Sequence, residues 1–317
     1  METSTKVAKQ VKNKSRSSLE MRKSMQLIVL AIPGMIWFLV FCYFPMVGTV
    51  IAFKDYKPKQ GMWGSKWVGL ENFKFLFSSN DAGRLVFNTI FYNFLSIFLV
   101  AAVSVAIAIL MDLVEKRIYL KTYQTMLFLP RFISWVVVGY MSIILFHYEY
   151  GLMNQIVVAL GGENISWFLT PKYWRFIIPA FSIWKTMGYT SLIYYGTIMG
   201  IDTQIFESAE IDGATTFGKI WHITLPLLKS TIIIMSLMSV GSIMRADFGL
   251  FYYVPNNSGA LYAVTDVLDT YIYRALRGAG DMSSSAAASF FQSVVGLIMV
   301  VSCNAIVKKI DDESSLF

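Results

Sequence analysis

Charged residues, cysteines and histidines are all scarce in this chain of 317 residues. Only 15% of the residues are Asp, Glu, Lys or Arg, whereas a soluble domain carries about 25%. The two cysteines, Cys42 and Cys303, lie inside separate apolar runs, which excludes a disulfide scaffold and offers no metal-ligand spacing. The two histidines, His147 and His222, form no triad or ligand cluster. We therefore expect no catalytic site and no metal site.

Basic residues are in excess, and their placement points to a membrane surface. The net charge is +7, and 56% of the residues are hydrophobic. Nucleic acid is one partner that such a charge permits, but the basic residues flank apolar runs and form no aromatic-interleaved patch. Anionic lipid at the inner leaflet explains them better. We predict membrane lipid as a partner and no nucleic acid.

Long apolar segments dominate the rest of the sequence. The segments 27–53 and 85–111 contain no charged residue, and about 20 apolar residues suffice to span a bilayer. The first is too long for a signal peptide, whose apolar core has about 7–15 residues. The fold class predicted is an all-α membrane protein with six transmembrane helices. The expected spans are 27–53, 85–111, 123–146, 176–201, 230–254 and 283–307.

The basic flank at the start of the chain sets the expected orientation. Residues 1–24 are polar, Ser-rich and hold seven Lys and Arg residues, so we expect a cytoplasmic basic tail. The six-span domain then occupies residues 25–317, and both termini are cytoplasmic. In this orientation the internal segments hold more Lys and Arg than the longer external loops do.

The stretch Glu207–Lys229 lies between the fourth and fifth expected spans and is amphipathic. A helical pattern begins with Glu207, Ala209, Ile211 and Ala214, and Asp212-Gly213 breaks it, since glycine reaches backbone angles that other residues avoid. A second apolar face follows, formed by Phe217, Ile220 and Trp221 at i, i+3 and i+4. We predict a helix, a glycine turn and a second helix, with the whole coupling loop at 202–229.

This stretch resembles a known signature. The letters ESAEIDGATTFGKIWHITLPLL are similar to the EAA signature of permease subunits of bacterial ABC importers, with Ser208 in place of the usual first alanine. The matching positions are Glu207, Ala209, Asp212, Gly213, Ala214, Phe217, Ile223, Leu225 and Pro226. GLENFKFLF, LPRFISWVVVG and DVLDTYIYRALRGAGDMSSSAAASFFQSVVG extend the resemblance over nearly the whole chain. The last is most like the sugar-permease branch for multiple sugars or aldouronates.

The resemblance implies a type I ABC importer permease that carries a sugar, expected to be an oligosaccharide, across the bacterial cytoplasmic membrane. Its implied partners are a second homologous permease, ABC ATPase subunits and an extracytoplasmic solute-binding protein. ATP and Mg would be bound by the partner ATPase, with no cofactor in this chain. In such importers the coupling loop fits a cleft on the ATPase. The residues assigned to it are Glu207, Ala209, Asp212, Gly213, Ala214 and Phe217.

A near-match to a nucleotide-binding loop occurs in the same stretch. Gly213, Gly218 and Lys219 spell GxxxxGK, but Ile220 stands where a Ser or Thr would hold Mg²⁺. No β-strand is expected before it, and membrane spans flank it. We therefore predict a transport subunit without its own ATPase site.

Candidate substrate residues lie in the two spans that flank the coupling loop. Aromatic faces suit sugar rings, and sugar hydroxyls need hydrogen-bond partners, although interfacial aromatics and ordinary helix packing explain the same residues. The candidates are Trp184, Lys185, Tyr189, Tyr194, Ser239, Ser242 and Arg245. By resemblance, positions 184 and 189 match a Trp and a sugar-contacting Tyr of the maltose importer's larger permease.

Lys185 and Arg245 need partners, because a charge within a span costs at least about 2.5–3.5 kcal/mol. Arg245 and Asp247 are two residues apart, so they do not face each other on a regular helix. An acidic sugar, a carboxylate on the second permease or an irregular helix would each resolve this. Lys185 is a candidate for sensing substrate charge.

The sequence is also compatible with other functions. The coupling signature is shared across substrates, so a permease for another solute such as glycerol phosphate is an alternative. A secondary transporter is a second alternative, although such proteins usually show inverted repeats and acidic coupling sites. A membrane enzyme would need a nucleophile, base or ligand constellation. A sensor could share the topology but would not need the coupling loop.

Overall fold

The computed structural model describes residues 25–74 and 80–310. The predicted basic tail (1–24), the end of the GLENFKFLF stretch and the last seven residues lie outside the described residues. The described chain is mostly helical, as predicted for the fold class. One small addition is a two-stranded antiparallel pair, β1 (Lys54–Asp55) with β2 (Lys66–Trp67).

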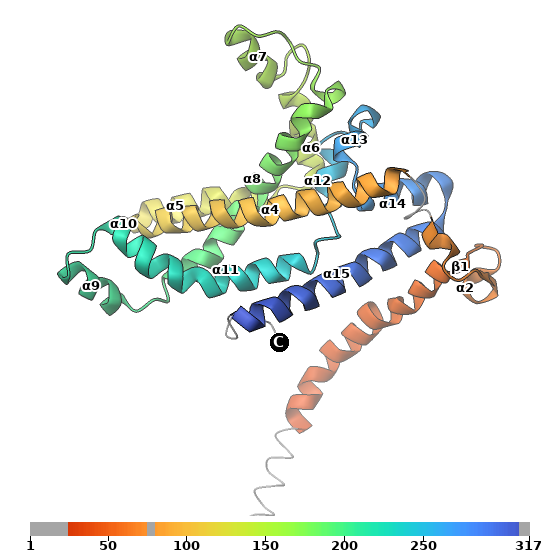
Figure 1. The fold of residues 1–317 in the computed structure, drawn as a ribbon, viewed down its shortest axis with the longest axis horizontal. Helices are drawn as coiled ribbons and strands as arrows, with labels where there is room; N and C mark the ends of the chain where they lie inside the picture. The colour runs from red at the N-terminus through yellow and green to blue at the C-terminus, as the bar shows by residue number, and fades with distance from the viewer. Residues whose placement is uncertain (1–24, 75–79, 311–317) are drawn as a thin grey trace, which may run out of the picture.

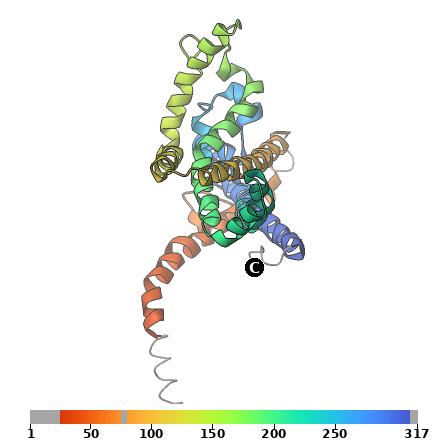
Figure 2. The ribbon, with the colours of Figure 1, turned by 90° about the vertical axis from the view of Figure 1, so that its left-hand side faces the viewer.

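Four helices of the described chain are long and apolar enough to cross a membrane. They are Met25–Phe53, Ala82–Asp112 within α4 (Asn80–Asp112), Thr216–Val240, and Met282–Lys309 within α15 (Met282–Ile310). A fifth candidate is a bent pair of shorter helices. The helix that begins at Met25 extends away from the other elements in both views (Figures 1 and 2). The number of spans, six, therefore stays a prediction.

The centre of the molecule is a bundle of three helices. α4 packs along α8 (Trp174–Ile198), and α11 (Leu225–Val240) lies against both. Val105 and Ala108 of α4 meet Tyr194 of α8 and Leu228 of α11 in one buried apolar cluster. Figure 1 shows α9 (Thr203–Ile211) and α10 (Thr216–Lys219) at one end of this bundle, with β1 and α2 (Gly61–Gly64) at the other.

The third predicted span (123–146) is not one straight helix. α5 (Arg117–Phe128) continues through a 3₁₀ turn, and α6 (Trp135–Leu145) then leaves at an angle of 96°. Pro130 lies in this turn and has no backbone N–H to extend the helix. Ser134 accepts a hydrogen bond from the Val137 amide and so begins a new helix. The sequence contained both signals; the third span stays a prediction, with a bent pair of helices in place of one straight helix.

The fifth predicted span (230–254) is also interrupted. α11 ends at Val240, residues 241–247 are non-helical, and α12 (Phe248–Tyr253) follows. The Asp247 carboxylate accepts hydrogen bonds from the Gly249 amide at 3.0 Å and the Leu250 amide at 3.4 Å, which caps α12. The irregular helix offered as one explanation for Arg245 and Asp247 is what the structure contains.

At its other end α11 starts earlier than predicted. α10 (Thr216–Lys219) joins it through a π-helical turn, Ile220–Thr224, so that the helix is continuous from Thr216. The Leu225 amide donates to the Ile220 carbonyl, five residues back. Pro226 follows at once, and a proline ring clashes with the carbonyl four residues earlier in a regular helix. The wider turn accommodates this proline, so no break separates α10 from α11.

The predicted loops 147–175 and 255–281 contain short helices. These helices are α7 (Leu152–Ala159), α13 (Tyr262–Thr265) and α14 (Leu268–Arg274). In Figure 1, α7 is the one that lies farthest from the bundle. α13 contacts α8 and α4, and α14 contacts α12 and α15. An ion pair between Arg274 and the buried Asp266, 2.5 Å long, fixes α14. The segment that follows α12 is therefore packed structure.

Candidate functional site

The coupling loop forms two helices joined by a glycine turn. α9 (Thr203–Ile211) is capped by Asp202, whose carboxylate accepts from the Gln204 amide at 3.0 Å. Gly213 has φ = +77°, in the left-handed region that suits glycine, and nothing lies within 4 Å of where its Cβ would be. Thr215 then caps α10 by accepting from the Gly218 amide. The backbone alone dictates glycine at this turn.

The surface of this loop is unusually apolar for a projecting element. Ile211 is 87% exposed, Phe217 is 73% exposed and Trp221 is 60% exposed. The rings of Phe217 and Trp221 stack with centroids 6.3 Å apart. The remaining residues assigned to coupling are Glu207 and Asp212, both exposed, and Ala209 and Ala214, both half-buried. Clustered exposed apolar residues with acidic neighbours are typical of a protein interface.

The near-match to a nucleotide loop lies in this same element. Gly218 and Lys219 are part of helix α10, and the Lys219 amine pairs with the Glu210 carboxylate at 3.6 Å. A Walker loop follows a β-strand, and its backbone amides must be free to bind phosphate. The Gly218 amide instead donates to Thr215 within the cap.

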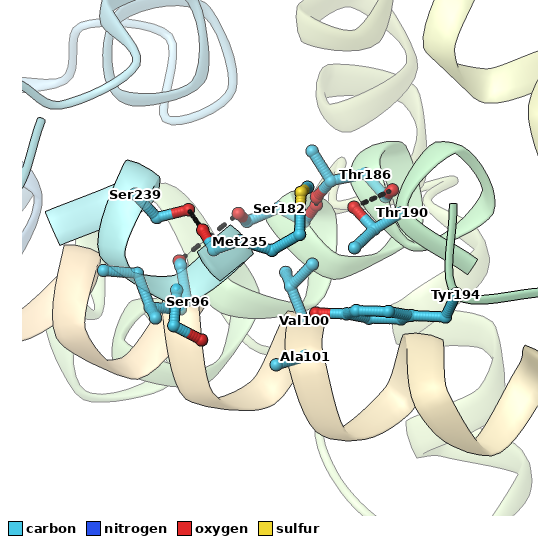
Figure 3. Close-up of a pocket in the computed structure, with 11 residues that line it drawn as sticks. Ser96, Val100, Ala101, Ser182, Thr186, Thr190, Tyr194, Met235 and Ser239 are labelled. Atoms are coloured by element: carbon cyan, nitrogen blue, oxygen red, sulfur yellow. Dashed lines mark hydrogen bonds between the residues drawn. The ribbon is translucent and has the colours of Figure 1, made fainter. Parts of the chain in front are cut away.

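A pocket of about 200 Å³ opens between α4, α8 and α11. Hydroxyl groups from all three helices face it, and Tyr194 lies toward one end (Figure 3). We call it the hydroxyl pocket; its lining is Ser96, Ile97, Val100, Ala101, Ser182, Thr186, Thr190, Tyr194, Met235, Ser236 and Ser239. The Oγ atoms of Ser96 and Ser182 lie 3.3 Å apart across it.

Three of the seven hydroxyls that line this pocket donate to carbonyls of their own helix. Thr186 donates to the Ser182 carbonyl, Thr190 donates to the Thr186 carbonyl at 3.2 Å, and Ser239 donates to the Met235 carbonyl at 2.9 Å. A hydroxyl has one proton and two lone pairs. The oxygen lone pairs therefore face a cavity that suits a ligand rich in hydroxyl donors.

The structure does not gather the seven predicted substrate residues at one place. Tyr194 and Ser239 line the hydroxyl pocket. Trp184 lines a separate apolar cavity with Phe181, and Tyr189 is 43% exposed with the Arg131 guanidinium 5.3 Å from its ring centroid.

The other three candidates lie at the two helix breaks. Lys185 is buried and its amine hydrogen-bonds to the backbone of the α5–α6 turn. Ser242 and Arg245 are exposed on the non-helical segment 241–247. Five hydroxyl-bearing residues of the hydroxyl pocket were not predicted: Ser96, Ser182, Thr186, Thr190 and Ser236. The repeat of Ser and Thr at 182, 186 and 190, one helical face, was the available signal.

Polar side chains from three helices hold the non-helical segment 241–247. Asn93 of α4 donates to the carbonyls of Ile243 at 2.9 Å and Arg245 at 3.2 Å. Gln292 of α15 donates to the Met244 carbonyl at 2.8 Å. The Asp269 carboxylate of α14 accepts from the Ala246 amide at 2.7 Å. Non-helical backbone at membrane depth occurs where protein buries it or where it lines a cavity.

Burial raises the pKa of the Asp269 carboxyl above its ordinary value, and the hydrogen bonds from Ala246 and Gln292 oppose that shift. Arg245, by contrast, points outward. Its Nη2 donates to the Ser293 hydroxyl at 2.9 Å, and it forms no ion pair with any described residue. A guanidinium in this position can bind an anion bidentately.

Comparison with known proteins identifies the family. Residues 104–312 match the family model of the binding-protein-dependent transport system inner membrane component. The chain belongs to this family. Its members are membrane permeases of ABC importers. This permease is 36% identical to Protein LplB of Bacillus subtilis over 92% of each chain. It is 35% identical to the polygalacturonan/rhamnogalacturonan transport system permease protein YteP of the same organism, over 95% of this chain and 93% of that one.

Solved structures support the same family assignment. The permease superposes on a chain of a bacterial ABC transporter involved in the import of the acidic polysaccharide alginate, with a TM-score of 0.82 and 31% identity, covering 93% of this chain and 99% of the other. A second match, also with a TM-score of 0.82, is to a chain of the bacterial alginate ABC transporter in complex with an alginate pentasaccharide-bound periplasmic protein. The predicted type I importer permease fold is thereby confirmed.

Proposed function

We propose that this permease moves an oligosaccharide through a route that includes the hydroxyl pocket, driven by partner ATPases acting on the coupling loop. The observation that carries this proposal is connectivity. α8 leads into α9 after four residues, and α10 is continuous with α11. Both α8 and α11 wall the hydroxyl pocket. A rigid displacement of the coupling loop therefore moves two walls of the pocket together.

The partners proposed for this movement are those that the family implies. The exposed apolar residues Ile211, Phe217 and Trp221 fit a cleft on an ATPase subunit, and a second homologous permease completes the route. The ATPase holds ATP and Mg, and this chain holds neither. A solute-binding protein delivers the substrate outside. The permease lies in the bacterial cytoplasmic membrane, with the tail 1–24 and both termini cytoplasmic and residues 25–317 forming six spans.

The relatives' names favour one substrate class. YteP is named for polygalacturonan and rhamnogalacturonan, and the structural match imports alginate, an acidic polysaccharide. A third relative, AraP of Bacillus subtilis, is named for arabinooligosaccharides, at 26% identity over 84% of this chain. We propose an oligosaccharide that carries carboxylates. Arg245 supplies the cation, and the hydroxyl pocket accepts hydrogen bonds from the sugar hydroxyls.

The test is purification of the permease from native membranes in mild detergent, with mass spectrometry of the proteins that remain bound. We expect a second permease and an ATPase at stoichiometric ratio. The solute-binding protein encoded with them would then be screened against acidic and neutral oligosaccharides. A permease that purifies alone, from membranes in which other ABC complexes stay intact, would contradict the proposal. Binding of glycerol phosphate but no oligosaccharide would replace its substrate.

A further inference from the structure

Lys185 is a buried cation whose partners lie in the described chain itself. Its side chain in α8 is only 7% exposed. The amine donates to the carbonyl of Pro130 at 3.3 Å and to the carbonyl of Ile133. It also lies 4.7 Å from the centroid of the Trp135 ring. The three contacts fall on the α5–α6 turn and on the first residue of α6, at the break in the third predicted span.

Trp135 extends this contact to the second break. Its indole Nε1 donates to the Asp247 carboxylate at 2.8 Å. The other oxygen of Asp247 caps α12. Lys185 on α8 is thus connected through one aromatic ring to Asp247, the residue that immediately precedes α12.

The ring is well placed to transmit the interaction. A cation over an aromatic face is attracted by the ring quadrupole. A carboxylate that accepts the indole N–H pushes electron density into the same ring, and hydrogen bonds in series polarise one another. The Lys185 amine and the Asp247 carboxylate therefore strengthen each other's contact with Trp135.

Close packing joins α6 and α12 along their length. A Cβ at Gly249 would overlap Cδ1 of the Trp135 ring, and one at Gly139 would lie 2.8 Å from the Tyr253 carbonyl oxygen. Ser142 of α6 donates to the Val254 carbonyl at 2.8 Å. Only glycine permits the first two approaches. The two short helices beyond the breaks, α6 and α12, are consequently packed as one unit.

We propose that Lys185 is a positioning residue for transport and does not contact the substrate. It fixes the α5–α6 turn and, through Trp135 and Asp247, the start of α12. The non-helical segment 241–247, which carries Arg245, ends at this fixed point. Lys185 thereby holds the segment in its transport-competent arrangement. The predicted role in sensing substrate charge is replaced by this one.

The first test compares Lys185→Met with Lys172→Met in the reconstituted importer. Lys172 also lies 4.7 Å from an aromatic centroid, that of Tyr173, but it is exposed. Loss of charge-assisted hydrogen bonds reduces the competent fraction, and the apparent KM rises in inverse proportion, by about tenfold. We expect this for Lys185→Met, recovery to within about threefold for Lys185→Arg, and no change for Lys172→Met. An unchanged KM in Lys185→Met would overturn the proposal.

A double-mutant cycle tests the route through the ring. Trp135→Phe keeps an aromatic face but removes the indole N–H. If Lys185 acts through Trp135, the double variant Lys185→Met/Trp135→Phe is impaired no more than about twofold beyond the worse single variant. Losses that multiply would show independent roles and overturn the proposal.

A third readout needs no substrate, so it separates this proposal from the proposed function. The indole N–H resonance of Trp135 is identified in ¹⁵N-tryptophan-labelled complex as the one that Trp135→Phe removes. We expect it to shift upfield in Lys185→Met as the bond to Asp247 lengthens, and to stay in place in Lys172→Met. A resonance that Lys185→Met leaves unmoved would overturn the proposal even if no sugar is transported.

Discussion

The indole nitrogen of Trp135 lies 2.8 Å from the carboxylate of Asp247, although the two residues are 112 positions apart in the sequence. Each stands next to a break, one in the third predicted span and one in the fifth. The contact ties together two interruptions that are separate in the sequence. It places the non-helical segment that carries Arg245 against a fixed element of the fold.

Gly213→Asp is predicted to uncouple transport while leaving the permease in the membrane. The substitution forces a side chain into a left-handed conformation at the turn between α9 and α10, which costs about 1 kcal/mol. It also adds charge to the face that we propose meets the ATPase. Membrane content stays within about twofold, and substrate-stimulated ATP hydrolysis falls at least tenfold.

The matched control for this variant is Gly196→Ala. Gly196 lies in α8 with ordinary backbone angles and, like Gly213, has nothing within 4 Å of the position that a Cβ would take. It should transport normally. Full stimulation of the ATPase in Gly213→Asp would remove the assignment of the coupling loop.

Thr186→Val tests the hydroxyl pocket. The change keeps the side-chain shape and removes one hydroxyl from the lining. Loss of one hydrogen bond to a sugar is worth about 0.5–1.5 kcal/mol, so KM for uptake rises about two- to tenfold. Thr122→Val is the control, because its hydroxyl also donates to the carbonyl four residues earlier, at 2.9 Å, but it is exposed on α5. Equal kinetics in the two variants would exclude the pocket from the route.

Arg245→Gln tests the charge of the substrate. Hydrogen bonds to charged groups contribute about 1.5–3 kcal/mol, so uptake of an acidic oligosaccharide falls about ten- to a hundredfold. Arg245→Lys keeps the charge but loses the bidentate geometry and gives an intermediate loss. Competition with the carboxyl-reduced oligosaccharide measures the selectivity. If the loss is the same for the acidic and reduced sugars, Arg245 does not bind the carboxylate.

Asp269 is predicted to make a pH-dependent contribution to the stability of the fold. Because burial raises its pKa, the folded permease binds this proton more tightly than the unfolded chain does. The resulting stabilisation is complete below the ordinary pKa of 3.8 and is lost as pH rises through the raised value. In detergent, the melting temperature of Asp269→Asn should therefore vary less across this window than that of the native chain. Identical pH profiles would assign the dependence to other groups.

The helical class, the position of the glycine turn and the apolar segments were predictable from the sequence because each depends on local pattern. Runs without charge give long helices, and Gly213 marks the turn. The sequence also contained Pro130, Ser134 and Asp247, the residues that begin and end helices at the two breaks. Averaging apolar character over about 20 residues conceals such breaks, so each span was predicted as a single helix.

The site was less accessible to prediction, because its residues come together only by packing. The side chains that hold the segment 241–247 by hydrogen bonds, Asn93, Asp269 and Gln292, come from three other helices. No spacing in the sequence connects these positions. Lys185 was predicted as a candidate substrate contact because a charge within a span needs a partner. The structure provides partners for it in two backbone carbonyls and a ring, which only packing brings together.

Uptake into proteoliposomes tests whether ATP-driven motion of the coupling loop moves an acidic oligosaccharide past the hydroxyl pocket. The proteoliposomes hold the permease with its purified partners and are supplied with binding protein and labelled oligosaccharide. We predict uptake that requires ATP and binding protein, and that is stronger for the acidic sugar than for its carboxyl-reduced form. Uptake without ATP, or driven only by an ion gradient, would contradict the proposed function.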